Sequence, residues 1–600
     1  MKKVNRTLLK SFLGLVALLL IVSIILFIPQ KASSEPWVQT NGPYGGYIHC
    51  FAIEGKDIFV GTEGNGVFHS TNNGTSWNDV NSGLTSKNVY SLAISGTNII
   101  AGTNGGVYIS DNNGVSWNLN NSDLKNTVVL SLATSGTNIF AGTSSGIFVS
   151  TDNGTNWKAA NSGLSFISVN SLAISGNNIF AGTEDGGIFL STNNGESWSP
   201  VNSGLTTKQI NYITVSGTTI FAGTYGGGVF ASTNNGESWN AVNSGLTNNH
   251  IYSLVCSGNN IFAGTEDGIF LSSDNGTSWN AVNSGLTNKY VFSLAVDGKN
   301  IFAGTNGGGV FLSNNNGESW KGVNSGLTNT HVGSITMKDT SIFAGTNGAG
   351  IFFSDNNGKN WVEINSGLTN PYVFSLAVSG SNIFAGTNGG GVFLSTNNGT
   401  SWREVNSGLT NKYVYSLAVS GNNIFAGTLG GGVFLSTDNG TSWNPVNSGL
   451  PNPNVGSIAV SGTNVFVGTF GNGVFLSNDN GASWNEVNSG LTNTQIFTLA
   501  TSGTNIYAGT PEDGVFLSTD NGTSWHSVNS GVTNPKIDCL AASGKKVFAG
   551  TYGGEVFISK NSGKKWRAEN SGLENIDVYS FCISDSNIFA GTNGRGIWVR

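Results

Sequence analysis

Short apolar runs alternate with glycine- and asparagine-rich turns along the chain, and the same arrangement returns about every forty residues. Residues 415–450, for example, read YSLAVSGNNIFAGTLGGGVFLSTDNGTSWNPVNSGL. The apolar runs are short, rich in β-branched and aromatic residues, and bounded by turn-forming residues, which predicts strands and excludes helices. Each repeat therefore predicts four strands, here YSLAVS, NIFAGT, GVFLS and SWNPVN.

A tryptophan at the start of the fourth predicted strand marks the period, because successive copies lie 40 or 41 residues apart. Four antiparallel strands repeated at this spacing are typical of the blades of a β-propeller. The pattern therefore predicts an all-β fold built from propeller blades. The thirteen tryptophans are Trp77, Trp117, Trp157, Trp198, Trp239, Trp279, Trp320, Trp361, Trp402, Trp443, Trp484, Trp525 and Trp566.

The two ends of the repeat region each supply part of a blade. Residues 36–40 (PWVQT) match a fourth strand, whereas the last repeat, ending at Arg600, holds only the first three strands. We expect residues 36–40 to complete the last blade, which brings the count to fourteen and covers an open sheet edge. Because propellers typically hold about four to eight blades, we favour two seven-bladed propellers, at residues 35–325 and 326–600, over one large ring.

The N-terminal segment predicts export. Basic residues at positions 2, 3, 6 and 10 precede an apolar run from Phe12 to Ile28, and Ala32 and Ser34 fit a signal-peptidase site. We therefore interpret residues 1–34 as a signal peptide, and the protein as secreted, periplasmic or on the cell surface. The length of the run leaves an uncleaved membrane anchor open, and we expect no other membrane contact.

Composition narrows the classes of partner and ligand that the protein is expected to bind. Only 10% of residues are charged and the pI is near 5.3, so a nucleic-acid partner is not expected. The four cysteines have no metal-ligand spacing, and the scattered histidines suggest neither a metal site nor a cofactor. We expect the cysteines to be small buried side chains, with a disulfide from Cys50 to Cys539 or Cys582 left open.

The turn before ten of the thirteen tryptophans follows the pattern S-x-[D/N]-x-G-x-[S/T]-W, and the other three copies differ from it only in the residue before Trp, which is Asn156, Asn360 or Lys565. This motif resembles the Asp-box of the BNR-type propellers, a superfamily of sialidases, sortilin, photosystem II assembly factors and two-propeller xyloglucan-cleaving glycoside hydrolases. The resemblance covers nearly all of the predicted mature chain. It implies the propeller fold, but it does not imply one activity, because these relatives share the motif and differ in function.

We interpret the box itself as structural. Five copies carry Asp and eight carry Asn at the same position, and a catalytic carboxylate could not be replaced by an amide so often. An oxygen that accepts backbone N–H bonds across a tight turn can belong to either side chain. The structural candidates are Asp152, Asp274, Asp438, Asp479 and Asp520, together with the tryptophans Trp77, Trp117 and Trp157.

The turn between the second and third strands varies most among the repeats and suggests one set of functional candidates. Three copies carry an acidic pair, Glu184–Asp185, Glu266–Asp267 and Glu512–Asp513, and we favour the last two pairs. Paired carboxylates are what the acid and base of a glycoside hydrolase require. These four residues are therefore the catalytic candidates, although an acidic pair on a glycine-rich turn is also typical of a solvated loop.

The residue before the first strand suggests a second set. In five successive repeats it is aromatic or imidazole, and flat rings on a propeller surface suit the binding of glycan or peptide. Rings that simply pack between loops, or recent duplication of one unit, would give the same pattern. If two propellers form, this arc spans their junction. The candidates are His250, Tyr290, His331, Tyr372 and Tyr413.

Three functions remain open. We favour an exported binding or scaffold module for a glycan, a peptide or an envelope protein. The first alternative is a glycoside hydrolase acting on β-glucan or xyloglucan-type polysaccharide, and the second is a purely structural surface protein. The resemblance to sialidases does not extend to activity, because the predicted mature chain has only four arginines and they cannot form a central triad.

Overall fold

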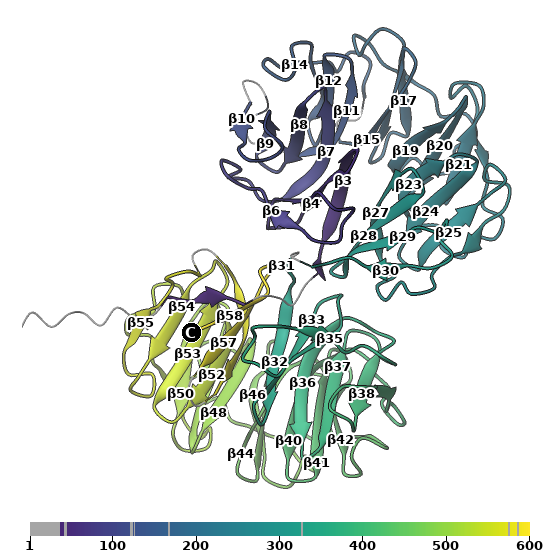
Figure 1. Ribbon diagram of the computed structural model, residues 1–600. Helices are drawn as coiled ribbons and strands as arrows, with labels where there is room; N and C mark the ends of the chain where they lie inside the picture. The colour runs from purple at the N-terminus through teal and green to yellow at the C-terminus, as the bar shows by residue number, and fades with distance from the viewer. Residues whose placement is uncertain are drawn as a thin grey trace, which may run out of the picture.

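The computed structural model describes residues 36–40, 45–120, 124, 127–165, 168–325, 328–573, 576–584 and 587–600. In these ranges the chain forms fourteen four-stranded antiparallel sheets, one two-stranded parallel sheet and no helix (Figure 1). No helix in this part of the chain is therefore long and apolar enough to cross a membrane. The predicted signal peptide, residues 1–34, lies outside the described residues.

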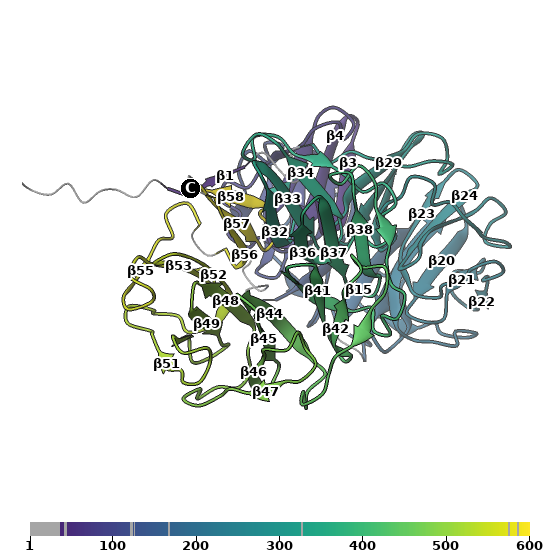
Figure 2. The same ribbon diagram turned by 90° about the horizontal axis from the view of Figure 1, so that it is seen from below.

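The sheets are the blades of two rings, seven in each (Figures 1 and 2). The first ring closes where β27 packs against β3, and the second closes where β32 packs against β56. The predicted pair of seven-bladed propellers is thus confirmed, and the single large ring is wrong. The inner strands of the first ring are β3 (Ile48–Glu54), β7 (Val89–Ser95), β11 (Val129–Ser135), β15 (Val169–Ser175), β19 (Ile210–Ser216), β23 (Ile251–Ser257) and β27 (Val291–Asp297). Those of the second ring are β32 (Val332–Lys338), β36 (Val373–Ser379), β40 (Val414–Ser420), β44 (Val455–Ser461), β48 (Thr498–Ser502), β52 (Ile537–Ser543) and β56 (Val578–Ile583).

One blade shows the common plan. Strands β40, β41 (Asn423–Thr428), β42 (Gly432–Ser436) and β43 (Asn444–Pro445) pair in chain order from the axis outward. The middle strands are almost wholly buried because sheets cover both of their faces, whereas β43 is exposed. Continuous apolar runs in the middle strands and a short polar outer strand follow from this position.

The N-terminal strand completes the last blade of the second ring, as predicted. Strand β1 (Val38–Gln39) pairs antiparallel with β58 (Ile597–Val599), which is the third strand of that blade. Trp37 occupies the place of a box tryptophan, since its backbone N–H donates to Ser571 O at 2.8 Å and its indole N–H to Glu569 O at 2.9 Å. The edge of the last blade is therefore covered.

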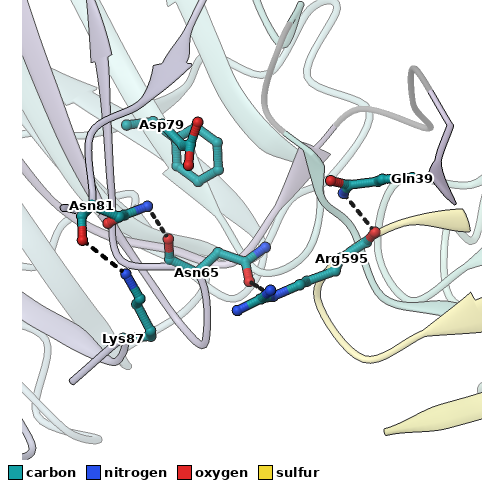
Figure 3. A pocket seen from close by; sticks show the side chains of 7 residues that line it. Gln39, Asn65, Asp79, Asn81, Lys87 and Arg595 are labelled. Carbon is teal, nitrogen blue, oxygen red and sulfur yellow. Dashed lines mark hydrogen bonds between the residues drawn. The ribbon is translucent and has the colours of Figure 1, made fainter. Parts of the chain in front are cut away.

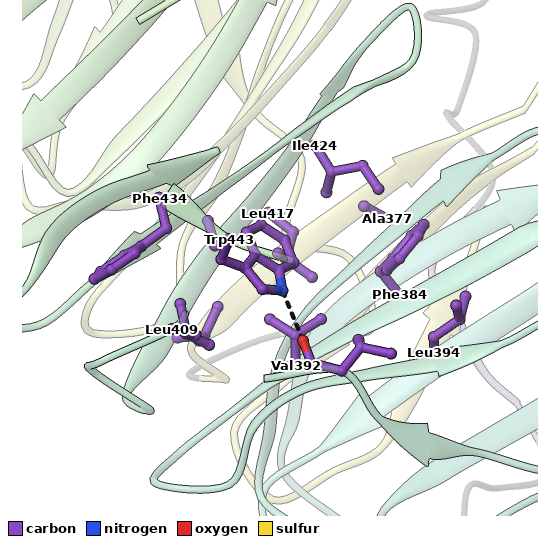
Figure 4. Packing of buried hydrophobic residues seen from close by; sticks show 12 residues of the cluster. Ala377, Phe384, Val392, Leu394, Leu409, Leu417, Ile424, Phe434 and Trp443 are labelled. Atoms are coloured by element: carbon purple, nitrogen blue, oxygen red, sulfur yellow. Dashed lines mark hydrogen bonds between the residues drawn. The ribbon is translucent and has the colours of Figure 1, made fainter. Parts of the chain in front are cut away.

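The box tryptophans hold neighbouring blades together. Trp443 is buried among Phe384 and Val392 of one blade and Leu417 of the next (Figure 4). Its indole N–H donates to Val405 O at 2.6 Å, so the only polar atom of the ring is satisfied. Phe384, Val392 and Leu417 belong to the apolar runs of the sequence. The blades stack face to face because this packing buries those apolar side chains.

Nearly every inner strand has a β-bulge at its second residue. The pairing of β23 with β24 (Asn260–Thr265), for example, skips Tyr252 between Ile251 and Ser253. A bulge turns its extra residue away from the sheet, and here bulge residues of adjacent blades meet around the axis. His49, for example, lies 5.3 Å from the ring of Tyr90 on one side and 5.8 Å from that of Phe292 on the other.

The chain passes between the rings twice, and small residues pack where it does. Strand β2 (Gly45–Gly46) pairs in parallel with β31 (Thr328–Asn329). A Cβ on Gly45 would lie 3.2 Å from Gly307 O and 3.3 Å from the Ala349 side chain, so the two rings approach closely. All four cysteines are free, and the disulfides left open for Cys50 do not form.

Candidate functional site at the ring junction

Turns between second and third strands share a face with the links between blades, which we call the junction face. Backbone bridges join the two types of segment: Tyr225 pairs with His250, Asn347 with Tyr372, and Asn388 with Tyr413. The box turns lie at the opposite ends of the strands. The variable turns and the predicted aromatic arc therefore belong to one surface.

In the first ring the arc is part of a hydrogen-bonded cluster. His250 stacks on Tyr225 with ring centroids 4.1 Å apart, and its Nδ1 lies 3.5 Å from Glu266 Oε1. Tyr252 donates its hydroxyl hydrogen to Glu266 Oε1 at 2.6 Å and lies 2.9 Å from the Tyr290 hydroxyl. Burial raises the pKa of Tyr252, and its bond to Glu266 adds to the rise.

The second propeller brings its own aromatic side chains to the same place. Asn347 donates its side-chain N–H to the hydroxyl of Tyr47 in the first ring at 2.7 Å. Burial raises the pKa of Tyr372, and Tyr47, Tyr290 and Glu266 of the first ring raise it further through their charges. Asn288, which accepts the backbone N–H of Tyr290 at 2.9 Å, also donates to Gly348 O of the second ring at 2.6 Å. Tyr290 and Tyr372, 82 positions apart in the sequence, thus both lie beside contacts that cross the junction.

His331 and Tyr413 lie on either side of Tyr372 in the arc. His331 stacks on Tyr579 with ring centroids 4.7 Å apart, and burial lowers the pKa of His331 to about 4. Tyr413 is 51% exposed, the most open member of the arc. Its ring lies over Gly389, where an added Cβ would meet it at 3.6 Å.

The acidic candidates are divided between the rings. Glu266 belongs to the cluster at Tyr252, and Asp267 accepts a hydrogen bond from Asn248 at 2.9 Å. Glu512 is exposed, and Asp513 accepts from Thr492 at 2.5 Å. In the described residues, no hydrogen bond or ion pair joins Glu512 or Asp513 to the first ring, so a catalytic pair drawn from the two turns stays a prediction.

Another carboxyl group stands out by its environment. Asp538 is the bulge residue of β52, and its Oδ2 atom is buried without a hydrogen-bond partner among the described residues. Burial and the neighbouring charge of Asp577 raise the pKa of Asp538 to about 7. Asp577 itself accepts a hydrogen bond from the Gly553 N–H at 2.7 Å. Asp538 can therefore hold a proton near neutral pH.

A pocket of about 250 Å³ lies between the first blade of the first ring and the last blade of the second (Figure 3). Arg595 Nε donates to Asn65 Oδ1 at 3.2 Å, and Lys87 Nζ donates to Asn81 O at 3.3 Å. Burial lowers the pKa of Lys87, and the charge of Arg595 lowers it further. Two cations and several amide groups there could bind a hydroxyl-rich or anionic group. Its lining residues are Gln39, Asn65, Phe68, Asp79, Asn81, Lys87 and Arg595.

The box turns have a different chemistry, which Asp438 illustrates. Its carboxylate accepts the backbone N–H of Ser442 at 2.9 Å and the Ser442 hydroxyl at 2.6 Å, and Ser436 donates to it at 2.8 Å. These bonds hold the pKa of Asp438 below its usual range. Asn72 makes the matching bonds in its own turn, accepting from the backbone N–H of Ser76 at 2.9 Å. In these two copies the hydrogen bonds of the box Asp or Asn side chain stay within one turn.

The same pattern recurs in the remaining boxes. Hydrogen bonds within the turn lower the pKa of each box Asp, to about 2 for Asp152, Asp479 and Asp520. Like Trp443, the box tryptophans Trp77 and Trp117 donate to a backbone carbonyl of a neighbouring blade, whereas Trp157 donates to Gly154 O in its own turn. In the described ranges no group of three or more His, Cys, Asp or Glu residues could hold a metal ion.

Comparison with known proteins agrees with this architecture. Residues 139–244 match the family described as DUF6242 beta propeller domain. No curated protein matches the chain in sequence. An ancestral GH74 enzyme is 17% identical, with 95% of this chain and 99% of that chain covered at a TM-score of 0.65. The fold is that of a two-propeller protein.

Two further structures share the fold. A GH74 xyloglucanase from Xanthomonas campestris is 15% identical, covering 94% of this chain and 99% of its own, with a TM-score of 0.64. PorZ, a surface component of the type-IX secretion system of Porphyromonas gingivalis, is 15% identical over 94% of this chain and 87% of its own, with a TM-score of 0.57. At these identities the likeness concerns the fold alone, and it agrees with the propeller fold that the Asp-box resemblance implies.

Sequence reasoning missed several residues of the junction. Tyr252, Tyr579 and Asp538 are bulge residues, and Asn347 lies in a second-to-third turn like those of its neighbours. A signal for the bulge residues was present, because the second position of the inner strand changes from repeat to repeat while the positions beside it stay constant. The contact of Asn347 with Tyr47 depends on how the rings dock, which no repeat pattern encodes.

Proposed function

We propose that the protein is an exported binding module that holds a polysaccharide chain across the junction of its two propellers. The observation that carries the proposal is that hydrogen bonds join the two propellers beside the arc. Asn347, the bridge partner of Tyr372, donates to Tyr47, and Asn288, which accepts the backbone N–H of Tyr290, donates to Gly348 O. Sugar rings stack on aromatic faces, and carboxylates and amides accept and donate to their hydroxyls. The arc combines both kinds of group along one surface.

Two other features support this assignment. Tyr413 and Tyr225, near the two ends of the arc, are 51% and 42% exposed, so each propeller offers an aromatic face to a ligand. The GH74 structures share the two-propeller fold, and one of them is a xyloglucanase. A β-glucan or xyloglucan-type chain is accordingly the first ligand class to test. Export rests on the predicted signal peptide, and the surface location of PorZ is in keeping with it.

The test is a triple variant, Tyr290→Ala, Tyr372→Ala and Tyr413→Ala, measured by calorimetry against xyloglucan and β-glucan oligosaccharides. We expect affinity to fall about 100-fold, because aromatic residues carry much of the energy of such contacts. Phe470→Ala is the matched control, since Phe470 lies on the same face of the second ring and contacts Phe497 of its own ring at 5.7 Å. Unchanged affinity in the triple variant would remove the arc from the site, and no binding to any glycan would favour a purely structural role.

A glycoside hydrolase is the second candidate, and Asp538 is the observation that favours it. A carboxyl group with a pKa near 7 suits a general acid at neutral pH. Release of reducing sugar from the same glycans, abolished by Asp538→Asn while oligosaccharide affinity is retained, would support it. Glu266→Gln and Glu512→Gln test the residues predicted from sequence, and no release by the unaltered protein would rule out this activity on these substrates.

A further inference from the structure

One blade of the second ring carries a cluster of cations on its box face, on the opposite side from the junction. In the first-to-second turn, the box and the outer strand of this blade, six exposed positions are Lys or Arg. The preceding blade has Thr504, Asn505, Thr519, Thr523, Ser524 and His526 at the equivalent positions. The six residues, which we call the lysine patch, are Lys545, Lys546, Lys560, Lys564, Lys565 and Arg567.

The backbone draws the two turns of the patch together. The N–H of Ser562 in the box donates to Lys545 O at 2.9 Å. One surface pocket of about 420 Å³ is lined by Lys545, Lys546 and Lys560, and another of about 300 Å³ by Lys560, Lys565 and Arg567. Because Lys560 belongs to both pockets, the cations form one continuous surface.

Few of these charges are neutralised within the protein. Arg567 forms an ion pair with the buried Glu569, which also binds Arg600 at 2.8 Å. No ion pair joins the five lysines to an acidic residue in the described part of the chain. The whole chain carries a net charge of −7, so a local cluster of like charges runs against its composition. Such a cluster costs repulsion in the free protein and is typical of a surface that meets an anionic partner.

The position of the N-terminal strand indicates which partner. Trp37 donates to backbone carbonyls of Ser571 and Glu569, directly after the patch in the chain. Fourth strands begin at the box face, so the chain enters β1 from the same side as the lysines and one blade away. Residues 1–35 precede this point, and their sequence includes the apolar run from Phe12 to Ile28.

We propose that the lysine patch docks the second ring onto an anionic lipid surface. If residues 1–34 are retained as the membrane anchor that the length of the apolar run leaves open, a polybasic patch on the side from which the chain enters β1 supplies a second membrane signal, because cations attract anionic headgroups over roughly one Debye length. In this orientation the box face of the second ring meets the membrane, and its junction face points away from it. The inference is independent of what the ring junction binds.

The experiment uses the full chain and a variant in which the five lysines take the residues of the preceding blade: K545T, K546N, K560T, K564T and K565S. These residues already occupy the same turns in a folded neighbour, so we expect the blade to fold. Flotation is measured with phosphatidylcholine vesicles, with and without about 30% phosphatidylglycerol. Neutral vesicles report any binding by the apolar segment alone.

We expect the unaltered chain to bind the anionic vesicles about tenfold more tightly than the neutral ones at about 0.05 M salt, with the preference lost at about 0.5 M salt and in the variant. Equal preference in the variant would overturn the proposal. So would binding of soluble polyphosphate that depends on the five lysines but is not accompanied by a preference for anionic vesicles, because the patch would then recognise a polymer.

The apolar segment could bind the unaltered chain and the variant to neutral and anionic vesicles alike. In that case amine acetylation followed by mass spectrometry gives a second readout. Lys560 and Lys564 should be protected on anionic vesicles and reactive on neutral ones. Lys412, which is exposed on the junction face, should react equally on both and serves as the internal control. Equal reactivity of the patch on both vesicles would overturn the proposal.

Discussion

The two ends of each blade share one backbone but differ in how their side chains are used. At the box end, Ser436 and Asp438 bond to their own turn, and Trp443 bonds to the neighbouring blade. At the junction end, Tyr372 and Tyr413 occupy a position that differs from blade to blade, with Asn454 and Gln495 in the next two blades. Side chains that hold a blade together are repeated, whereas side chains that do not are free to differ.

The lysine patch shows that this rule applies to single positions, and not only to faces. Lys560, Lys564 and Lys565 lie within a box turn, at positions whose side chains point to solvent. Ser559, Asn561 and Gly563 of the same turn keep the bonds found in the other boxes. A box can therefore change its charge without losing its structure.

The largest contrast should come from removing one aromatic ring at each end. Trp443→Ala should lower the free energy of unfolding by about 3–5 kcal/mol, because it leaves a cavity between two blades. Tyr413→Ala, at a half-exposed ring of the junction end, should cost less than about 1 kcal/mol. Chemical denaturation monitored by far-UV circular dichroism measures both losses of stability. Equal losses would contradict the division between the two ends of the blade.

Glycines that contact a neighbouring blade and glycines that do not should differ in a related way. A Cβ on Gly408 would overlap Trp443 O of the next blade, and its φ is +80°. Gly421 also has a positive φ, +60°, but no atom lies within 4 Å of its added Cβ. We expect Gly408→Ala to cost about 2–4 kcal/mol and Gly421→Ala about 1 kcal/mol, the strain of the left-handed backbone alone. Similar losses in thermal unfolding would show that overlap with Trp443 is relieved by a backbone shift.

The pH dependence of stability should report Asp538 at the junction end. Its folded-state pKa of about 7 lies above the unfolded value, so the folded chain binds the extra proton. The stability from this group is fully present below about pH 4 and is lost as the pH rises through 7. Asp538→Asn should therefore stabilise the second ring by about 1–2 kcal/mol at pH 8, an amount reduced by partial exposure, and leave stability at pH 4 unchanged. Thermal unfolding at the two pH values measures the difference, and an equal effect at both would place the pKa near its ordinary value.

The fold could be predicted from the sequence to the level of single strands, because each strand is short, apolar and bounded by glycine in every copy. The strand at residues 38–39 was predictable for the same reason, since PWVQT matches a fourth strand that the last repeat lacks. Division into two rings followed from the blade count. No sequence feature marks the crossing near residue 325, because the junction is held by small residues such as Gly45 and Gly348 that are common throughout.

The candidate site was predictable only in part. The arc that includes Tyr290 and Tyr372 was visible as five successive aromatic or imidazole side chains, and the structure places both of these tyrosines beside hydrogen bonds that cross the junction. Asp538 could not be recognised, because its unusual environment arises from a bulge and from Asp577, which lies one blade away. The lysine patch is visible in the sequence as six cations between residues 545 and 567. It was overlooked because the net charge of the whole chain is negative.

The smallest effect is expected where the repeats have already made the substitution. Asp438→Asn keeps an oxygen that accepts the Ser442 N–H, as Asn72 does for Ser76, so the melting temperature at pH 7 should stay within about 1 °C. Asp438→Ala removes that acceptor and should lower the melting temperature by about 2–4 °C.

Because hydrogen bonds lower the pKa of Asp438 in the folded chain, the contribution of this carboxylate to stability is present above about pH 4 and is lost as the pH falls. The Asn variant should therefore lose less stability than the unaltered protein between pH 5 and pH 2, about where that carboxylate titrates. A large loss at pH 7 in the Asn variant would mean that the charge at this position has a role beyond closing the turn.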